Sequence, residues 1–528
     1  MKFRSGYRAL AMAALGLSAA FAAAPASADT AAEIRALKAR LNKLEAEEAA
    51  ARRAAKAAAQ QTAHAAPAAA GHAAPDAPKH WYEKLSIRGY TQMRYNDTID
   101  ASGWNDVYSP HDRSVGPRRN FLLRRTRLIF SGDVSSHLYL YLQMDMASAP
   151  SGTFSNAATA GVNPTYAFYN QPYVQIGTYG NSAGNFAQMR DAYADISIDE
   201  KKEFRFRVGQ SKIPYGFENM QSSQNRLALD RADAINSCCK DERDLGVFFY
   251  YTPEHVRHLL RDLVKNNLKG SGDYGMFALG VYNGQGANRI ELNNGVHIVS
   301  RFTYPYVFEN GQIVEASIQG YTGRYMPATS SITPSVGMTT NWAGYRPPGW
   351  FGAGVPFINA PGYNNLNNLV LGNYPGVGAY SYGCLNGCQG VKDDRVAVTG
   401  VIYPQPFGLK AEWNWGRGPA LDPTQTYIRS AGLNGGYIEA TYKYDDMMFG
   451  LGTFFPFVKW QYFNGGWKTE TNAPSARTYE LDVGVEWQPL PEVEVTAIYS
   501  RMNRTNTGAA PYRQFQADLL RMQLQWNY

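Results

Sequence analysis

Polar and apolar residues alternate along most of the chain, beginning near Leu85 and continuing to the last residue. Successive side chains of an extended strand point to opposite faces, so this period of two gives each segment one apolar and one polar face. The pattern is clearest in the segments 85–94, 137–145, 481–488 and 520–528. About 16 such segments follow one another, an even number of the kind that transmembrane barrels use. The sequence therefore predicts an all-β fold, a transmembrane antiparallel β-barrel over residues 81–528.

The connections between these segments are expected to alternate strictly between short turns and long loops rich in Gly and Asn. Short turns are expected at 133–136, 199–202, 404–406, 445–446 and 489–492, and long loops at 96–120, 147–185, 212–242 and 322–391. Outer-membrane barrels have short turns on the periplasmic rim and longer loops on the exterior rim. A soluble sandwich has no reason to sort its connections by length, so the alternation favours a barrel in a bacterial outer membrane.

One connection on the short side departs from this pattern. Between 252 and 273, apolar residues recur at helical spacing and basic residues fill the other positions, which predicts a basic amphipathic helix at the periplasmic rim. The apolar residues are Val256, Leu259, Leu260, Leu263, Val264 and Leu268, and the basic ones are Arg257, Arg261, Lys265 and Lys269. Such a helix lies either in the membrane interface or against the mouth of the barrel. His255 and His258 lack partners at ligand spacing, so they do not indicate a metal site.

The N-terminus carries the features of a secretory signal peptide over residues 1–28. A basic region with Lys2, Arg4 and Arg8 precedes the apolar stretch 10–24 and a small-residue cleavage signature at 26–28. The alternative, a membrane anchor, is disfavoured because the apolar stretch is too short. We expect residues 29–61 to form a periplasmic helix, either a short coiled coil that oligomerises the chain or a solitary Ala-rich helix. Residues 62–80, rich in Ala, Pro, His and Gly, are expected to be a flexible linker.

Composition and charge exclude several classes of protein. Only 18% of the residues are charged, and past residue 28 the chain has no apolar run of roughly 18 residues, which excludes a bundle of transmembrane helices. Residues 81–528 contain 40 Lys and Arg against 38 Asp and Glu, so the domain is not basic overall and no nucleic-acid partner is expected. Hydrolase, zinc-protease, nucleotide-binding and haem motifs do not occur, so neither an enzyme nor a cofactor or metal is expected.

Basic residues fall on the polar faces of several predicted strands. Arg125 and Arg127 share one face of 121–131, and Arg205 and Arg207 share one face of 204–209. The full set of expected pore-lining cations from this pattern is Arg88, Arg94, Arg125, Arg127, Arg205, Arg207 and Lys212. Cations on an interior wall attract anions, and Arg matches the geometry of phosphate oxygens. Arg124 falls on the apolar face and is expected at the outer interface or in a bulge.

The alternative for these cations is pairing with carboxylates across the lumen, which would give a rigid pore with little selectivity. The candidate partners are Asp145, Asp191 and Asp195, and further inward acids are expected at Glu439, Asp482, Glu486 and Glu494. Charge placement, rather than net charge, must therefore create any preference for anions.

The loop 212–242 is the natural candidate to fold into the lumen, because it combines cations with the apolar residues 227–229. Arg226 and Arg231 are the candidates for a constriction, and the alternative is an extracellular lid without effect on conductance. Cys384 and Cys388 lie four apart in the longest loop, and a disulfide between them is plausible in an oxidising compartment. Cys238 and Cys239 are adjacent in the loop 212–242, but nothing in the sequence places the two Cys pairs together, so a metal site is not expected.

Several segments together resemble the phosphate-selective porin O/P family. The resemblance is carried by FLLRRTRLIFSGDV (121–134), FRFRVGQSKIPYGFE (204–218), ERDLGV (242–247), ALGVYNGQGANR (278–289) and FPFVKWQYFNGG (455–466). It implies a homotrimeric 16-stranded anion channel with an inward third loop, and it adds Lys459 as a basic pore residue. The long insertion 322–391 and the Cys pairs depart from the family pattern.

The function expected from the sequence is passive diffusion of small hydrophilic solutes, with preference for small anions such as phosphate, through a trimer surrounded by outer-membrane lipid. Two alternatives remain open. One is a general porin with little selectivity. The other is a structural envelope protein that tethers the outer membrane through its periplasmic coiled coil.

Overall fold

A computed structural model describes residues 80–103, 106–112, 114–116, 119–148, 174–179, 182–238, 243–289, 291, 293, 295–327, 390–423, 428–445, 450–470, 472–508 and 512–528. Lys79–Tyr528 form one compact unit. The expected signal peptide at 1–28, the helix at 29–61 and the linker up to residue 79 lie outside the described residues. So do Cys384, Cys388 and most of the expected loop 322–391.

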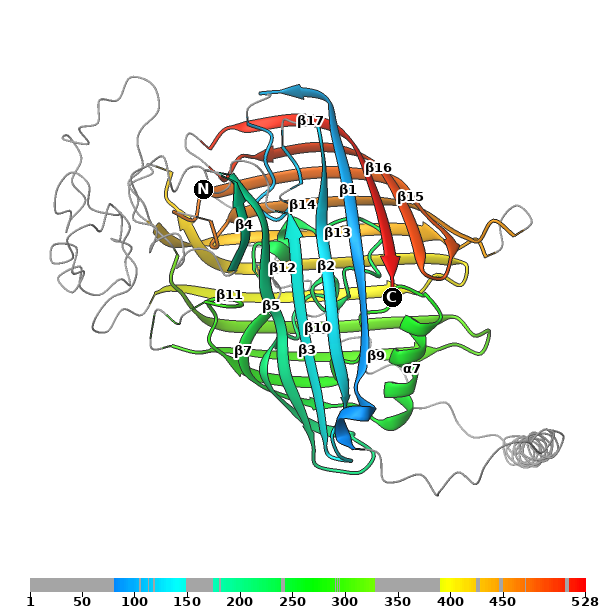
Figure 1. The fold of residues 1–528 in the computed structure, drawn as a ribbon. Coiled ribbons are helices and arrows are strands. Elements are labelled where there is room, and N and C mark those ends of the chain that lie inside the picture. The colour runs from blue at the N-terminus through cyan, green and yellow to red at the C-terminus, as the bar shows by residue number, and fades with distance from the viewer. Residues whose placement is uncertain are drawn as a thin grey trace, which may run out of the picture. The chain divides into compact units, whose positions relative to one another are not determined.

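The unit is a closed antiparallel β-barrel, as the sequence predicts (Figure 1). Sixteen strands form the ring, and it closes where the last strand pairs with the first. The short β4 is an addition that pairs with one end of β5. The strands are β1 (Ser86–Ser102), β2 (Asn120–Asp133), β3 (Leu138–Ser148), β4 (Val174–Tyr179), β5 (Ser182–Ser197), β6 (Phe204–Lys212), β7 (Arg243–Tyr251), β8 (Phe277–Tyr282), β9 (His297–Val307), β10 (Ile313–Tyr325), β11 (Val391–Ile402), β12 (Phe407–Leu421), β13 (Ile428–Tyr442), β14 (Thr453–Gly466), β15 (Ser475–Leu490), β16 (Val493–Thr505) and β17 (Gln514–Asn527).

The two faces of the strands follow the alternation in the sequence. In β6, Phe206 and Val208 are 39% and 42% exposed on the outside, whereas Arg205 and Arg207 are buried on the inside. The same contrast recurs around the ring, which gives the barrel an apolar exterior and a polar interior. A single-residue shift of register would reverse every side chain, so the apolar exterior fixes the register of each strand.

The connections divide between two rims, but their lengths do not alternate strictly. We call the rim with the β2–β3, β5–β6 and β7–β8 connections the turn rim, and the opposite one the loop rim. The loop-rim connection of β12 and β13 is 422–427, whereas the turn-rim connection of β13 and β14 is the longer 443–452. The expectation of strict alternation is therefore wrong in the last third of the chain. Strand parity alone fixes the rim of a connection, and a hairpin tolerates loops of many lengths.

The connection between β6 and β7 folds into the barrel, and we call residues 213–242 the inner loop. Its two short helices, α5 (Phe217–Met220) and α6 (Asp233–Asn236), are fully buried, and Figure 1 shows them in green within the ring of strands. Helix α6 contacts β12, β13 and β14. Gly216 precedes α5 with a φ of 79°, and a side chain there would meet Ile235 and Glu412. The inner loop can thus turn sharply only because this position has no Cβ.

The expected amphipathic helix is present on the turn rim as α7 (Glu254–Lys265). Its buried residues Val256, Leu260 and Leu263 pack inside the barrel mouth with Phe217 of the inner loop. Of the two placements expected for this helix from sequence, the structure shows the one in which it packs against the mouth of the barrel. A 3-10 helix, Trp81–Lys84, precedes β1. Among the helices described, none has the length and apolar character needed to cross a membrane.

Candidate functional site

The inner surface of the barrel has two walls of opposite charge. Strands β1–β3 and β5–β7 carry nine buried Lys and Arg residues against four buried Asp, and we call them the basic wall. Strands β10–β16 carry seven buried Asp and Glu residues against four buried Lys and Arg, and we call them the acidic wall. The nine cations are Arg94, Arg124, Arg125, Arg127, Arg190, Arg205, Arg207, Lys212 and Arg243. A domain with almost no net charge thus contains a strongly asymmetric interior.

Two of these arginines reach the interior through irregularities of the sheet. Between β1 and β2, Gln92 is opposite Arg125 and Met93 is opposite Leu123, so Arg124 is an extra residue in a β-bulge. Between β3 and β5, Gln143 is opposite Asp191 and Met144 is opposite Met189, which leaves Arg190 as an extra residue. A bulge breaks the alternation of faces, and both side chains are buried. Arg124 therefore lies in a bulge, one of the two positions expected for it.

A cluster of four arginines, three on the basic wall and Arg521 on the adjoining β17, surrounds two carboxylates. Asp112, from the connection between β1 and β2, and Asp230, from the inner loop, both contact Arg94 at 2.7 and 2.8 Å. The other guanidinium groups belong to Arg124, at 3.3 Å from each carboxylate, Arg125, at 3.6 Å from Asp230, and Arg521, which contacts both. Burial opposes ionisation, but the arginines hold the pKa of Asp112 well below its ordinary value. We call these six residues the arginine cluster.

The inner loop is also anchored to the acidic wall. Lys459 of β14 donates to Glu218 at 2.5 Å, and its ammonium lies 4.9 Å from the centre of the Tyr437 ring. Glu218 in turn accepts from the backbone N–H of Ala232 at 2.7 Å. Burial would raise the pKa of Glu218, but nearby lysines, foremost Lys459, hold it below its ordinary value. Lys459 is therefore on the opposite wall from the other expected pore cations, and it holds the loop in place.

Arg226 and Arg231 point into the inner loop and the connection beside it. Arg226 donates to the carbonyls of Glu218 and Gln221 at 3.2 and 3.0 Å. Arg231 donates to Asn219 at 2.6 Å and contacts His111 of the β1–β2 connection at 3.0 Å. Both are buried, so the loop uses these cations to maintain its own conformation.

Arg205 and Arg207 are paired with acids on the basic wall. Arg207 makes a two-pronged contact with Asp195 at 2.7 and 2.8 Å, and its guanidinium lies 3.9 Å from the centre of the Tyr193 ring. Arg205 contacts Asp273 at 2.7 Å, and this arginine foremost outweighs burial and lowers the pKa of Asp273 to about 2. Pairing with carboxylates, considered above as the alternative to free anion-attracting cations, is therefore present in the structure.

A cavity of about 280 Å³ lies between the basic wall, the inner loop and the segment after α7. Its lining includes five cations, Arg88, Arg127, Arg207, Lys212 and Arg243, but only two carboxylates, Asp191 and Asp273. Arg88 is the exposed member of this set, and its guanidinium lies 5.9 Å from the centre of the Tyr141 ring. Lys212 donates to the carbonyls of Met220 and Gln221 at 3.0 and 2.9 Å. The lining of this cavity therefore carries an excess of positive charge.

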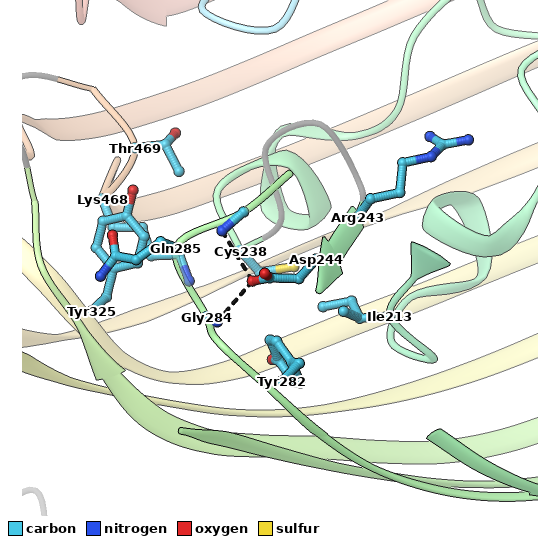
Figure 2. A pocket seen from close by; sticks show the side chains of 11 residues that line it. Ile213, Cys238, Arg243, Asp244, Tyr282, Gly284, Gln285, Tyr325, Lys468 and Thr469 are labelled. Carbon is cyan, nitrogen blue, oxygen red and sulfur yellow. Dashed lines mark hydrogen bonds between the residues drawn. The ribbon is translucent and has the colours of Figure 1, made fainter. Parts of the chain in front are cut away.

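A second cavity lies nearer the loop rim and is much smaller, about 20 Å³. Figure 2 shows Lys468, Tyr325 and Cys238 around it, with Asp244 accepting from Gly284 N–H at 2.7 Å and from Gly286 N–H at 3.0 Å. Cys238 is disulfide-bonded. This space has room for about one water molecule and is too small for a solute. Among the described residues, no cluster of His, Cys, Asp and Glu could hold a metal ion.

The structure brings together most of the residues expected from sequence and adds others. Arg88, Arg127, Arg207 and Lys212 line one cavity, and Arg94 and Arg125 meet in the arginine cluster. The residues expected at the site from sequence did not include Arg190, Arg243, Arg521, Asp112 and Asp230. The alternation places Arg521 on the polar face of the last strand, but it does not reveal that this arginine meets two carboxylates from distant loops. The others lie in bulges, at a strand end or in loops, where no period identifies a face.

Comparisons with known proteins link the sequence of this chain to one protein family. The sequence profile of the family described as "Phosphate-selective porin O and P" matches residues 98–345 and 383–528. No curated protein sequence matches the chain.

Solved structures with a related barrel share little sequence with this chain. OmpF of Salmonella typhi in complex with daunomycin has a TM-score of 0.44 at 10% identity, covering 85% of this chain and 99% of that one. An anion-selective porin from Comamonas acidovorans has a TM-score of 0.42 at 8% identity, covering 84% and 99%. The outer-membrane channel DcaP of Acinetobacter baumannii has a TM-score of 0.42 at 9% identity, covering 84% and 97%. Likeness of this degree carries no information about solute or selectivity.

Proposed function

Because the chain belongs to the phosphate-selective porin O and P family and is an outer-membrane channel, we propose that it passes small hydrophilic solutes passively and favours phosphate-like anions. The loop rim faces the exterior and the turn rim faces the periplasm, where the N-terminal segment also lies. Three copies assemble in the membrane lipid, each with its own pore. No chemical step is involved, and the ion gradient alone drives transport.

The observation that carries this proposal is the excess of cations on the basic wall and around the 280 Å³ cavity. Five cations and two carboxylates line that space, so a solute within it meets a positive potential. The effective dielectric constant falls in a narrow, partly dehydrated passage, which strengthens the attraction to an anion. Guanidinium groups also present donors that match the oxygens of phosphate.

The second candidate is a general porin with little selectivity, and the ion pairs favour it. Arg207 with Asp195, and Arg243 with Asp191 at 2.7 Å, are close pairs whose charges largely cancel at a distance. Selectivity then depends on the cations that keep some exposure, and Arg88 is the clearest of them.

Reversal potential in a KCl gradient across a planar bilayer separates these candidates. We expect the wild-type protein to give a potential on the anion side and phosphate to reduce the chloride current. Arg88→Gln should shift the potential toward zero, because it removes an exposed cation of the cavity and breaks no described ion pair. Arg477→Gln is the matched control, since Arg477 is exposed on the outward face of β15 and should leave the potential unchanged.

Each remaining outcome points to a different function. A potential near zero in the wild type, unaffected by Arg88→Gln, would indicate the general porin. A potential on the cation side would refute the proposal outright. A folded protein without any current would support the structural envelope protein, since a tether requires no open passage.

A further inference from the structure

The connection between β7 and β8 crosses the mouth of the barrel on the turn rim. Residues 252–276 leave the ring at β7 and return at β8, yet Lys269 and Asn267 reach the side chains of Glu486 and Gln488 on β15. Around the ring, β15 is seven strands from β8 in one direction and eight from β7 in the other. The segment therefore spans nearly the full width of a 16-stranded barrel, and we call residues 252–276 the crossbar.

Buried polar contacts fix the far end of the crossbar. The Lys269 ammonium donates to Glu486 at 2.5 Å, and both side chains are less than 5% exposed. The same ammonium lies 4.6 Å from the centre of the Phe455 ring, and Asn267 donates to Gln488 at 2.5 Å. Asn267 and Lys269 have φ values of 55° and 61°, in the left-handed region that is uncommon for residues other than Gly. With this backbone conformation, the side chains of both residues contact β15.

An apolar cluster packs α7 of the crossbar against the end of β11 on the acidic wall. Val256, Leu260 and Leu263 of α7 pack with Val401 and Tyr403 at the end of β11. Leu268 of the crossbar and Phe217 of the inner loop complete the cluster. The crossbar also supports the inner loop directly, since Gln221 donates to the Lys269 carbonyl at 2.7 Å. Close packing of these side chains leaves no room for water between α7 and the end of β11.

The space on the other side of the crossbar is open. The 280 Å³ cavity is lined there by Val264 and 271–274 of the crossbar, by the inner loop and by the basic wall. Figure 1 shows α7 at the end of the barrel where β17 ends, which is the turn rim. At this rim the crossbar thus lies between the two charged walls, and the 280 Å³ cavity lies beside the basic one.

We propose that the crossbar determines selectivity by closing the mouth along the acidic wall, so that solutes pass only along the basic wall. The inference rests on the proposed channel function and specifies how an interior with carboxylates on one side can favour anions. Lys269 is a positioning residue in this scheme: it neutralises Glu486 and holds the crossbar against β15, without contacting the solute.

Deletion of the crossbar tests the proposal directly. Tyr251 and Phe277 pair across the β7–β8 hairpin, so a short turn can join these strands. Replacing residues 254–269 by two glycines keeps Asp273 and its ion pair with Arg205. Single-channel conductance should rise roughly twofold because the second half of the mouth then carries current, and the reversal potential should move toward the cation side. Lys265→Gln, on the exposed face of α7, is the control and should change neither quantity.

A charge swap provides a second test with less change to the chain. Lys269→Gln with Glu486→Gln removes both charges and should raise conductance, whereas Lys269→Glu with Glu486→Lys restores an ion pair and should return it toward wild type. Unchanged conductance and reversal potential in the folded deletion variant would overturn the proposal, as would unchanged values in the neutralised pair if the deletion does not fold. A wild-type protein without anion preference would refute the proposed function, while the conductance of the same variants would still test whether the crossbar closes the mouth.

Discussion

Replacement of Asp230 by Asn tests whether the arginine cluster holds the inner loop against the basic wall. The Asp230 carboxylate lies 2.8 Å from Arg94, 2.9 Å from Arg521 and 3.3 Å from Arg124. The Asp230 side chain is 11% exposed, so water can replace few of the contacts that the arginines lose with its carboxylate. Asn has nearly the same shape and keeps one oxygen that can accept, so the change removes the charge and little else.

The expected loss is large for a single substitution. Removing one partner of a buried ion pair costs about 3–5 kcal/mol, because the remaining charges stay buried without compensation. Here Arg94, Arg124 and Arg521 would share the one carboxylate of Asp112. Arg125 would lose its contact with Asp230, and the mutual repulsion of the four guanidinium groups adds to the loss. The oxygen retained by Asn offsets part of this, so we expect about 3 kcal/mol of lost stability. The attachment of the inner loop to the basic wall also weakens. The loop should then move more, and open-channel current noise should increase.

The assay compares this variant with Asp97→Asn. Asp97 forms an ion pair of similar length with Arg119, 2.6 Å, but Arg119 is 70% exposed, and solvent screens such pairs. Denaturant unfolding in detergent, followed by gel mobility, gives the change in stability of each variant, and bilayer recording gives the noise. We expect the Asp230 variant to be clearly less stable and the Asp97 variant to match the wild type. Equal stability of the two variants would refute the reasoning, because burial would then make no difference.

Three further outcomes follow from the geometry. Gly216→Ala should destabilise the inner loop by about 1–3 kcal/mol, since φ is 79° there, and denaturant unfolding would show it. Leu481→Arg places a charge on the lipid face of β15 and should cost about 2–4 kcal/mol near the membrane midplane, seen as reduced folding into lipid vesicles. Acid should weaken the interior contacts of Asp112, Glu218 and Asp273, whose pKa values are below the ordinary ones, to about 2 for Asp273. The unfolded chain then binds more protons, so this stability is present above about pH 4 and is lost as pH falls toward 2, which unfolding as a function of pH would reveal.

The arrangement of charges explains why net charge is a poor guide to this interior. The domain is nearly neutral, yet its cations and acids are segregated between two walls, and most cations are paired with acids from other segments. Such pairs keep a polar interior folded, because a buried charge without a partner is costly. Five cations line the 280 Å³ cavity, and Arg88 is the exposed one among them.

The alternation of residues by itself determined the barrel and the two faces of its strands. In β2 and β6 the arginines expected to face inward do so, because a period of two allows only two orientations and lipid accepts only the apolar one. The helical spacing between 252 and 273 likewise determined α7 and its buried face. These features depend on neighbours along the chain, so they can be inferred without the fold.

Only the tertiary structure decided which charges meet. Lys459 pairs with Glu218 over 241 positions in the chain, and Arg521 meets Asp112 over 409, distances at which no local pattern carries information. The inward position of Arg124 required a bulge, whose place depends on the pairing of β1 with β2. The path of the crossbar depended on β15, on the far side of the ring, because closure of the barrel is what brings β15 opposite β7 and β8.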